Sequence, residues 1–190
     1  MTRLRALATL LLVAGISPGQ GQQTPSPPAA KDGAEVAPRG QHPARDIKYG
    51  DWRKLCFTAA GAKTLCRTTI TGTFETGQTA IRIDLIGRED GNARLQLFLP
   101  VGMYLQAGVK LSVDQKAALR LPYTWCLTNM CIAADVADQK FLQDMDEGKT
   151  LSVEVVDSNV LTVTTSVPLE HFASVRKGAA VQTLDQAIDE

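Results

Sequence analysis

Histidine is the scarcest reactive residue in this sequence: there are two among 190 residues, and aromatic side chains make up only 5%. His42 lies in a proline-rich stretch, where we expect nothing to hold it in a catalytic geometry, and His171 lies in a predicted C-terminal helix. The sequence also has no Gly-x-Ser-x-Gly elbow, no His-Glu-x-x-His pair, no glycine-rich phosphate loop and no acidic calcium loop. We therefore expect a non-enzymatic protein with no metal and no cofactor.

An excess of charge of either sign is also missing, since the chain has 20 basic and 20 acidic residues. Such a balance gives no electrostatic reason to bind nucleic acid or an anionic membrane. The hydrophobic fraction of 44% suffices for a globular core and is too low for a protein that spans the membrane many times. We expect no nucleic-acid partner.

Long hydrophobic runs are absent after the N-terminus, and the run at the N-terminus is short. Residues 3–5 include two arginines, residues 6–16 are uncharged and largely apolar, and small residues follow within 17–21. This is the layout of a secretory signal, and its apolar part is shorter than the ~20 residues that a spanning helix needs. We predict a signal peptide over residues 1–21 and an exported protein, periplasmic or associated with the outer envelope. No transmembrane segment is expected after cleavage.

The four cysteines form two close pairs that are far apart in sequence: Cys56 with Cys66, and Cys126 with Cys131. Four cysteines allow three pairings, and the local one is favoured because each bond would then close one hairpin or turn. A zinc site is the rival interpretation, but these gaps do not match paired C-x2-C knuckles. Export also favours disulfides over thiolates.

The chain is predicted to have three parts after the signal. Residues 22–45 contain five prolines and almost no large apolar side chain, which is typical of a flexible spacer. Residues 46–177 show the short alternating runs of a β domain. Residues 178–190 are expected to form a C-terminal tail.

Alternating hydrophobic residues predict most of the strands. Ile81, Ile83 and Leu85 alternate with polar residues, and Leu95, Leu97 and Leu99 lie on one face of the next run. Comparable runs lie at 49–57, 65–70, 109–113, 117–121, 151–155 and 161–167. Asp90-Gly91 and residues 157–159 have turn chemistry. The fold class expected is mainly β, a single β-sandwich-like domain.

Two helices should interrupt the strands. Asp138 has the properties of an N-cap for a short helix after the second cysteine pair, ending at Gly148. The face that this helix would bury carries Phe141, Leu142 and Met145. Pro168 suits the first turn of a C-terminal helix that extends to about Lys177.

The few aromatic residues are the candidates for partner binding. Trp52 lies in the first strand, and Tyr123 and Trp125 lie beside Cys126. Tryptophan and tyrosine dominate interface hot spots, but an aromatic ring packed against a disulfide explains the same pattern. An alternative function is a periplasmic enzyme or thiol-redox protein that uses the Cys126/Cys131 pair. The four residues between these cysteines favour a structural clip over the C-x-x-C of redox enzymes.

The ordered motifs of the β domain resemble the invasion-associated locus B (IalB) family of bacterial envelope proteins. The resemblance begins at the Tyr-Gly-Asp-Trp sequence of residues 49–52, continues through the Leu-Pro-x-Gly turn at 99–102, and extends to about residue 176. The matching framework residues are Asp51, Trp52, Cys56, Cys66, Pro100, Gly102, Cys126 and Cys131.

This resemblance implies an exported, β-rich and non-enzymatic envelope protein that contributes, in some members, to host-cell invasion. The function expected for this chain is a disulfide-stabilised binding or structural module. Its partner would be an envelope or host protein of unknown identity. The resemblance supplies no catalytic residues.

Overall fold

The computed structural model describes residues 37–42, 46–59, 63–88 and 90–186. The signal peptide expected at residues 1–21 lies outside these described residues, as does most of the spacer. The strands are β1 (Gly40–His42), β2 (Ile47–Tyr49), β3 (Arg53–Ala59), β4 (Leu65–Phe74), β5 (Thr79–Gly87), β6 (Ala93–Pro100), β7 (Val109–Val113), β8 (Leu119–Leu121), β9 (Tyr123–Cys126), β10 (Met130–Ala137), β11 (Thr150–Val156), β12 (Leu161–Pro168) and β13 (Gln182–Gln186). The helices are the short 3-10 helix η1 (Leu105–Ala107), α1 (Gln139–Glu147) and α2 (Phe172–Lys177).

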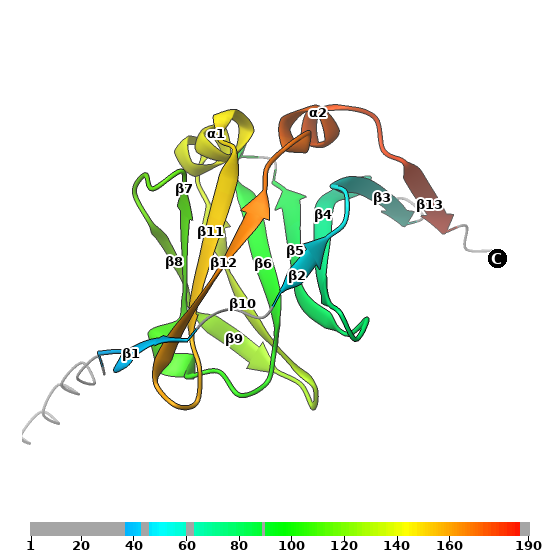
Figure 1. Cartoon of the computed structure of the whole chain (residues 1–190). Coiled ribbons are helices and arrows are strands. Elements are labelled where there is room, and N and C mark those ends of the chain that lie inside the picture. The colour runs from blue at the N-terminus through cyan, green and yellow to red at the C-terminus, as the bar shows by residue number, and fades with distance from the viewer. Residues whose placement is uncertain (1–36, 43–45, 60–62, 89, 187–190) are drawn as a thin grey trace, which may run out of the picture. The chain divides into compact units, whose positions relative to one another are not determined.

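The strands form two sheets that pack against each other as a sandwich (Figure 1). The smaller sheet has five strands in the order β1-β12-β11-β7-β8. The larger sheet has eight strands in the order β13-β3-β4-β5-β6-β10-β9, with β2 paired to β4 outside this path. The mainly β, sandwich-like fold expected from the sequence is therefore confirmed.

The core lies between the sheets and is built from the alternating residues of the strands. The inward side chains of these strands are buried, and Leu95 and Leu97 of β6 and Leu151 and Val153 of β11 are at most 1% exposed. The larger sheet turns its other residues outward, since neighbouring side chains of a strand point to opposite faces. Hydrophobic burial on one face of each sheet therefore fixes which residues each outer face presents.

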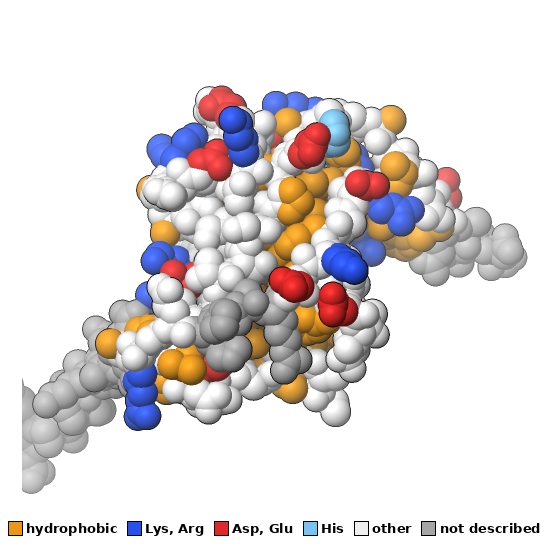
Figure 2. Space-filling model, in the orientation of Figure 1, with side chains coloured by type: hydrophobic (Ala, Val, Ile, Leu, Met, Phe, Trp, Pro, Cys, Tyr) orange, Lys and Arg blue, Asp and Glu red, His pale blue; other side chains and the backbone are white. Residues whose placement is uncertain are grey.

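The sandwich is closed by a polar contact on the side where β12 faces β2. The Tyr49 hydroxyl lies 2.8 Å from Thr165 Oγ1, and this hydrogen bond joins the two sheets. Hydrophobic side chains show as a stripe between these two strands (Figure 2). Burial raises the pKa of Tyr49, and the bond to Thr165 offsets part of that increase. The phenol therefore stays protonated and serves as a link between the sheets.

Helix α1 agrees with the sequence prediction in its cap, its buried face and its end. The Asp138 side chain accepts a hydrogen bond from the Phe141 N–H at 2.7 Å, which caps the helix N-terminus. Phe141, Leu142 and Met145 are buried, and Gly148 follows the last turn. No helix among the described residues is long and apolar enough to cross a membrane.

Helix α2 begins later than the sequence predicts. Pro168 is the last residue of β12, paired with Thr150, and the Leu169 N–H continues that pairing by bonding the Lys149 carbonyl at 2.9 Å. The helix starts at Phe172, after His171 in the left-handed conformation (φ 60°). The prediction of Pro168 in the first helical turn was wrong because proline also fits a strand edge that has no partner, and β1 pairs with β12 only at residues 161–163.

Both ends of the described chain extend the sheets, which corrects the predicted boundaries. Gly40–His42 falls within the expected spacer but forms β1, parallel to β12, and the Arg39 N–H donates to the Val160 carbonyl at 2.8 Å. Gln182–Gln186 falls within the expected tail but forms β13, parallel to β3. Backbone pairing with a distant strand orders these segments, although their composition resembles that of a linker.

The two helices are joined at one end of the sandwich by an ion-pair cluster around Asp146. The Asp146 carboxylate accepts hydrogen bonds from Arg176, whose Nε is 2.9 Å from Oδ1, and Lys177 Nζ lies 2.9 Å from Oδ2. Burial of this carboxyl would raise its pKa, but the hydrogen bonds from Arg176 and Lys177 outweigh burial and lower the pKa overall. The folded state therefore favours the ionised form of Asp146.

This lowered pKa predicts how folding stability depends on pH. A carboxyl whose pKa is lower in the folded state contributes stability above its unfolded pKa of about 3.9, and this contribution is lost as pH falls through the folded pKa. We expect Asp146→Asn to reduce the free energy of unfolding at pH 7 by about 1–2 kcal/mol and to flatten its decline below pH ~4. Urea unfolding between pH 7 and 2 measures both. The exposed Asp185→Asn is the matched control, and identical pH profiles for the two variants would contradict the prediction.

Candidate functional site

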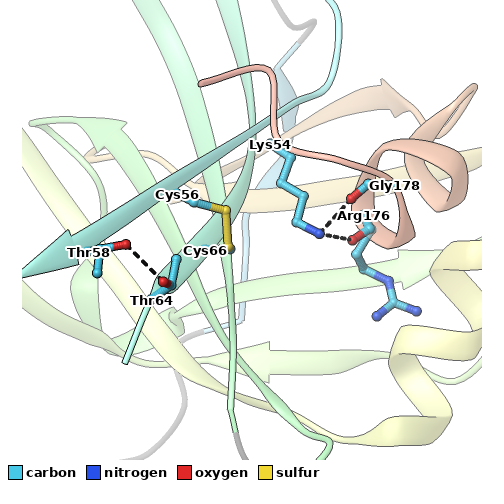
Figure 3. Close-up of a disulfide and its surroundings, with 7 residues drawn as sticks. All are labelled: Lys54, Cys56, Thr58, Thr64, Cys66, Arg176 and Gly178. Atoms are coloured by element: carbon cyan, nitrogen blue, oxygen red, sulfur yellow. Dashed lines mark hydrogen bonds between the residues drawn. A yellow bond between two sulfur atoms is a disulfide. The ribbon is translucent and has the colours of Figure 1, made fainter. Parts of the chain in front are cut away.

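The Cys56–Cys66 disulfide joins β3 to β4 where these two residues face each other in the antiparallel ladder (Figure 3). Their Cα atoms are 4.0 Å apart, and Cys56 is 7% exposed. Two residues before Cys56 on β3, Lys54 Nζ donates to the carbonyls of Arg176 at 3.1 Å and Gly178 at 2.8 Å. The predicted local pairing is confirmed, and the neighbouring lysine attaches β3 to the end of α2.

The Cys126–Cys131 disulfide joins β9 to β10 at the other edge of the same sheet. The two Cα atoms are 3.9 Å apart, and the Leu127 N–H closes the turn by donating to the Met130 carbonyl at 2.7 Å. Cys126 is exposed, whereas Cys131 is 3% exposed. Redox enzymes lower a thiol pKa at a helix N-terminus. The described helices begin elsewhere, at Leu105, Gln139 and Phe172.

Trp52 is a core residue, which corrects its prediction as a candidate for partner binding. It is 5% exposed, its Nε1–H donates to the Pro168 carbonyl at 2.8 Å, and its ring meets Phe172 edge-on with centroids 4.7 Å apart. Its indole therefore links β12 and α2 to the start of β3 and has no polar atom left to offer a partner. The sequence left both packing and partner binding open for Trp52, because charged residues flank it on either side.

Tyr123 and Trp125 are two residues apart on β9 but differ in exposure, because an irregularity in the pairing with β10, between Ile132 and Ala133, interrupts the alternation of the strand. Tyr123 packs partly buried against the core, and its hydroxyl is buried with no hydrogen-bond partner. Burial raises the pKa of Tyr123, so the phenol is neutral. Trp125 is 65% exposed and pairs with Ile132 on the outer face of the larger sheet. Of the three aromatic candidates, only Trp125 is available to a partner.

The two histidines are not placed together in the structure. His42 is the last residue of β1, and His171 precedes α2 with its side chain 77% exposed and 3.5 Å from the Glu170 carboxylate. Across the described ranges, no three His, Cys, Asp or Glu side chains group closely enough to hold a metal ion.

An arginine-lined hollow lies on the outer face of the larger sheet, beside β3, and the sequence did not predict it. Its volume is about 740 Å³. Residues that line it include Asp51, Arg53, Leu55, Arg67, Thr69, Thr71, Arg82 and Val181. The three arginines come from three adjacent strands, β3, β4 and β5, so the sheet register brings them together.

A buried carboxylate lies beneath two of these arginines. Asp84 is 2% exposed, and its side chain accepts a hydrogen bond from Thr69 Oγ1 at 2.5 Å. Arg67 Nη1 and Arg82 Nε each lie 3.4 Å from a carboxylate oxygen of Asp84. The Arg82 guanidinium also stacks 3.7 Å above the centre of the Phe98 ring. Asp84 and Phe98 therefore hold both guanidinium groups in place.

An apolar hollow of about 360 Å³ adjoins the arginine-lined hollow. Its lining includes Leu55, Phe57, Leu65, Arg67, Ile86 and Leu184. Leu55 and Arg67 line both hollows, so the two are adjacent. Phe57, Leu65 and Leu184 are 42%, 53% and 55% exposed and lie around one hollow, and a clustered apolar surface of this kind marks a candidate interaction site.

The outer face of the smaller sheet is different in character. Figure 2 shows that face as mostly polar, uncharged surface over β11, with charged side chains around it, whereas hydrophobic side chains gather beside β13. One of the charged pairs there is Lys110 with Glu154, 3.5 Å apart. The outer face of the larger sheet, with its arginine-lined and apolar hollows, is therefore the stronger candidate for a binding surface.

The sequence pattern around Arg82 and Asp84 fits either a solvent-exposed pair or a binding surface. Arg82 and Asp84 occupy the polar positions of an alternating strand, which predicts two solvated side chains. The structure instead buries Asp84, whose partners are Thr69 and Arg67 of β4 and Arg82 of its own strand. Only the register of β4 against β5, which pairs Thr69 with Asp84, reveals this arrangement.

Comparisons with known proteins agree with this fold. The family model described as "Invasion associated locus B (IalB) protein" matches residues 52–180, which is more than half of the chain. Two curated relatives, both invasion protein B homologs from Brucella abortus (strains 2308 and 9-941), are 25% identical over 105 residues, covering 55% of this chain. The chain spans about three fifths (61%) of the length of these relatives.

A solved structure has the same fold. The crystal structure of invasion associated protein B from Bartonella henselae superimposes with a TM-score of 0.62 and 22% sequence identity, covering 68% of this chain and 90% of that one. The disulfide-clipped sandwich and the family match over residues 52–180 lead to the same conclusion: this chain belongs to the invasion associated locus B (IalB) family.

Proposed function

We propose that this chain is an exported, non-enzymatic binding module of the cell envelope and that it binds through the outer face of the larger sheet. The observation that carries the proposal is the pair of adjacent hollows beside β3, one lined by arginines and the other by exposed apolar side chains. A concave surface with apolar walls and a few oriented polar groups is the usual form of a ligand site.

The oxidised cysteines support export. All four cysteines are in disulfides, and disulfides persist in oxidising compartments such as the periplasm and the cell surface. The N-terminal basic and apolar segments of residues 1–21 give an independent reason from the sequence.

The alternative, a thiol-redox protein using Cys126 and Cys131, has less support. The pair closes a β-hairpin instead of starting a helix, so the helix end that stabilises a thiolate in redox enzymes is not beside it. We propose a structural role for this disulfide.

A contribution to host-cell interaction is the finer part of the proposal. Its support is the word invasion in the names of the relatives from Brucella and Bartonella, which describes those proteins. The partner would be a component of the envelope or of the host cell that contacts the larger sheet.

Mass spectrometry without reduction, on protein recovered from the native cells, tests the proposed export. We expect a mature chain that lacks about its first 21 residues, as the layout of its secretory signal predicts, and is four hydrogen masses lighter than the reduced form. A cytoplasmic chain with an intact N-terminus and free thiols would contradict export.

Site-directed photo-crosslinking in cells tests the binding surface. A photo-reactive residue replaces Leu65 on the outer face of the larger sheet, and Lys110 on the outer face of the smaller sheet is the matched control. We expect adducts from position 65 in excess over position 110, with mass spectrometry identifying the captured molecule. Equal yields at the two positions would contradict the proposed surface.

A further inference from the structure

The arginine-lined hollow carries a surplus of positive charge. Arg53, Arg67 and Arg82 line it, while the carboxylates that reach it or lie beneath it are Asp51 and Asp84. Three guanidinium groups against two carboxylates leave a net charge of one positive unit. The charge of the hollow therefore favours an anionic ligand.

The donors of this hollow are held in position before any ligand arrives. Asp84 and the Phe98 ring fix Arg82, and Asp84 also holds Arg67, as described above. The two side chains remain 46% (Arg67) and 36% (Arg82) exposed. A guanidinium has five N–H donors, and each of these arginines approaches Asp84 through one nitrogen, so the donors on its other nitrogens remain for a ligand. This fork suits the oxygens of a phosphate or a carboxylate.

The adjoining hollow is lined mainly by apolar side chains, so it favours a ligand whose anionic group carries a hydrocarbon chain. From Arg67, the lining continues to Phe57, Leu65 and Leu184, whose exposed apolar surfaces lie on three neighbouring strands. Because Leu55 and Arg67 belong to both hollows, the apolar hollow lies directly beside the arginines, within reach of a chain attached to an anionic group bound there.

We propose that these two hollows together bind one anionic amphiphile, a molecule with a phosphate or carboxylate headgroup and a hydrocarbon chain. The headgroup binds Arg53, Arg67 and Arg82, and the chain lies on Phe57, Leu65 and Leu184. This inference rests on the proposed binding function, since it names the ligand class of the same surface.

Calorimetric titration of the whole chain, purified with both disulfides formed, tests the inference with dodecyl phosphate below its micelle concentration. We expect saturable binding at one site. Inorganic phosphate and the neutral dodecyl maltoside should each bind at least about tenfold more weakly, because each lacks one half of the interaction. Affinity for dodecyl phosphate should fall with added salt.

Two matched pairs of variants locate the site. Arg53→Gln should weaken dodecyl phosphate binding about tenfold, whereas Arg94→Gln, on the same sheet face but outside both hollows, should leave it within about twofold. Leu65→Ser should weaken binding by a similar factor, and Leu127→Ser, with comparable exposure of 50% against 53%, should not. Unchanged thermal unfolding verifies that each variant is folded.

Three results would overturn the inference. Equal affinity for the neutral amphiphile would indicate a non-specific apolar surface, and inorganic phosphate binding as tightly as dodecyl phosphate would indicate a simple anion site. Binding only above the micelle concentration would indicate recognition of an assembled surface. Any of these results would leave the tests of export and photo-crosslinking unaffected, so the two proposals fail separately.

Discussion

Replacing Trp52 by alanine is expected to lower the free energy of unfolding by about 3–5 kcal/mol, which is typical of a large aromatic side chain removed from a core. Trp52 is 5% exposed, packs edge-on against Phe172, and donates to the Pro168 carbonyl. Its removal leaves a cavity where β3, β12 and α2 meet. Urea unfolding followed by far-UV circular dichroism measures the change without relying on tryptophan fluorescence.

Two further substitutions separate the contributions of this side chain. Trp52→Phe keeps much of the ring contact but leaves the Pro168 carbonyl without its donor, so we expect a smaller loss of about 1–2 kcal/mol. Trp125→Ala removes the same residue type from a position that is 65% exposed and should change stability by no more than about 0.5 kcal/mol. A loss from Trp125→Ala as large as that from Trp52→Ala would contradict the assigned burial.

Removing the Cys56–Cys66 disulfide is the second change with a large expected effect. Its sequence separation is 10 residues, against 5 for Cys126–Cys131. The chain-entropy estimate gives about 2.7 kcal/mol for the first bond and about 2.1 kcal/mol for the second. We expect the double variant Cys56→Ala with Cys66→Ala to lose the larger amount in non-reducing urea unfolding.

The second pair provides the control for this experiment. Cys126→Ala with Cys131→Ala removes the same kind of cross-strand bond from the opposite edge of the sheet, and alanine avoids leaving a buried hydroxyl without a partner. A loss of stability that is clearly greater for this pair than for Cys56 and Cys66 would show that loop length does not govern these two bonds.

The elements predicted correctly from the sequence depend on residues close together in the chain. Helix α1 follows from a capping aspartate, apolar side chains at helical spacing and a terminal glycine. Each disulfide could be predicted because its two cysteines are close in sequence, on the two strands of one hairpin. Strand alternation predicted the inward residues of β5, β6 and β11. In each case the local sequence and the final packing favour the same structure.

The elements that were missed depend on pairing between distant residues. Strand β13 lies beside β3, where Gln182 pairs with Leu55, and no local pattern indicates that partner. Asp84 has the sequence environment of a solvated residue, and its burial depends on which residues β4 and β6 place beside it. The arginine-lined hollow therefore could not be found before the sheet register was known.

Strand β13 also determines how the larger sheet is protected against aggregation. The family match ends at residue 180, whereas β13 spans Gln182–Gln186 and covers the backbone edge of β3. A fragment trimmed to the family boundary would expose that edge next to Phe57 and Leu65, two apolar side chains that are already partly exposed. Unpaired edges bordered by apolar side chains recruit strands from other molecules. Strand β13 therefore moves the open edge of the sheet from β3 to a strand that carries the charged Asp185, and charged edge strands resist pairing with another molecule.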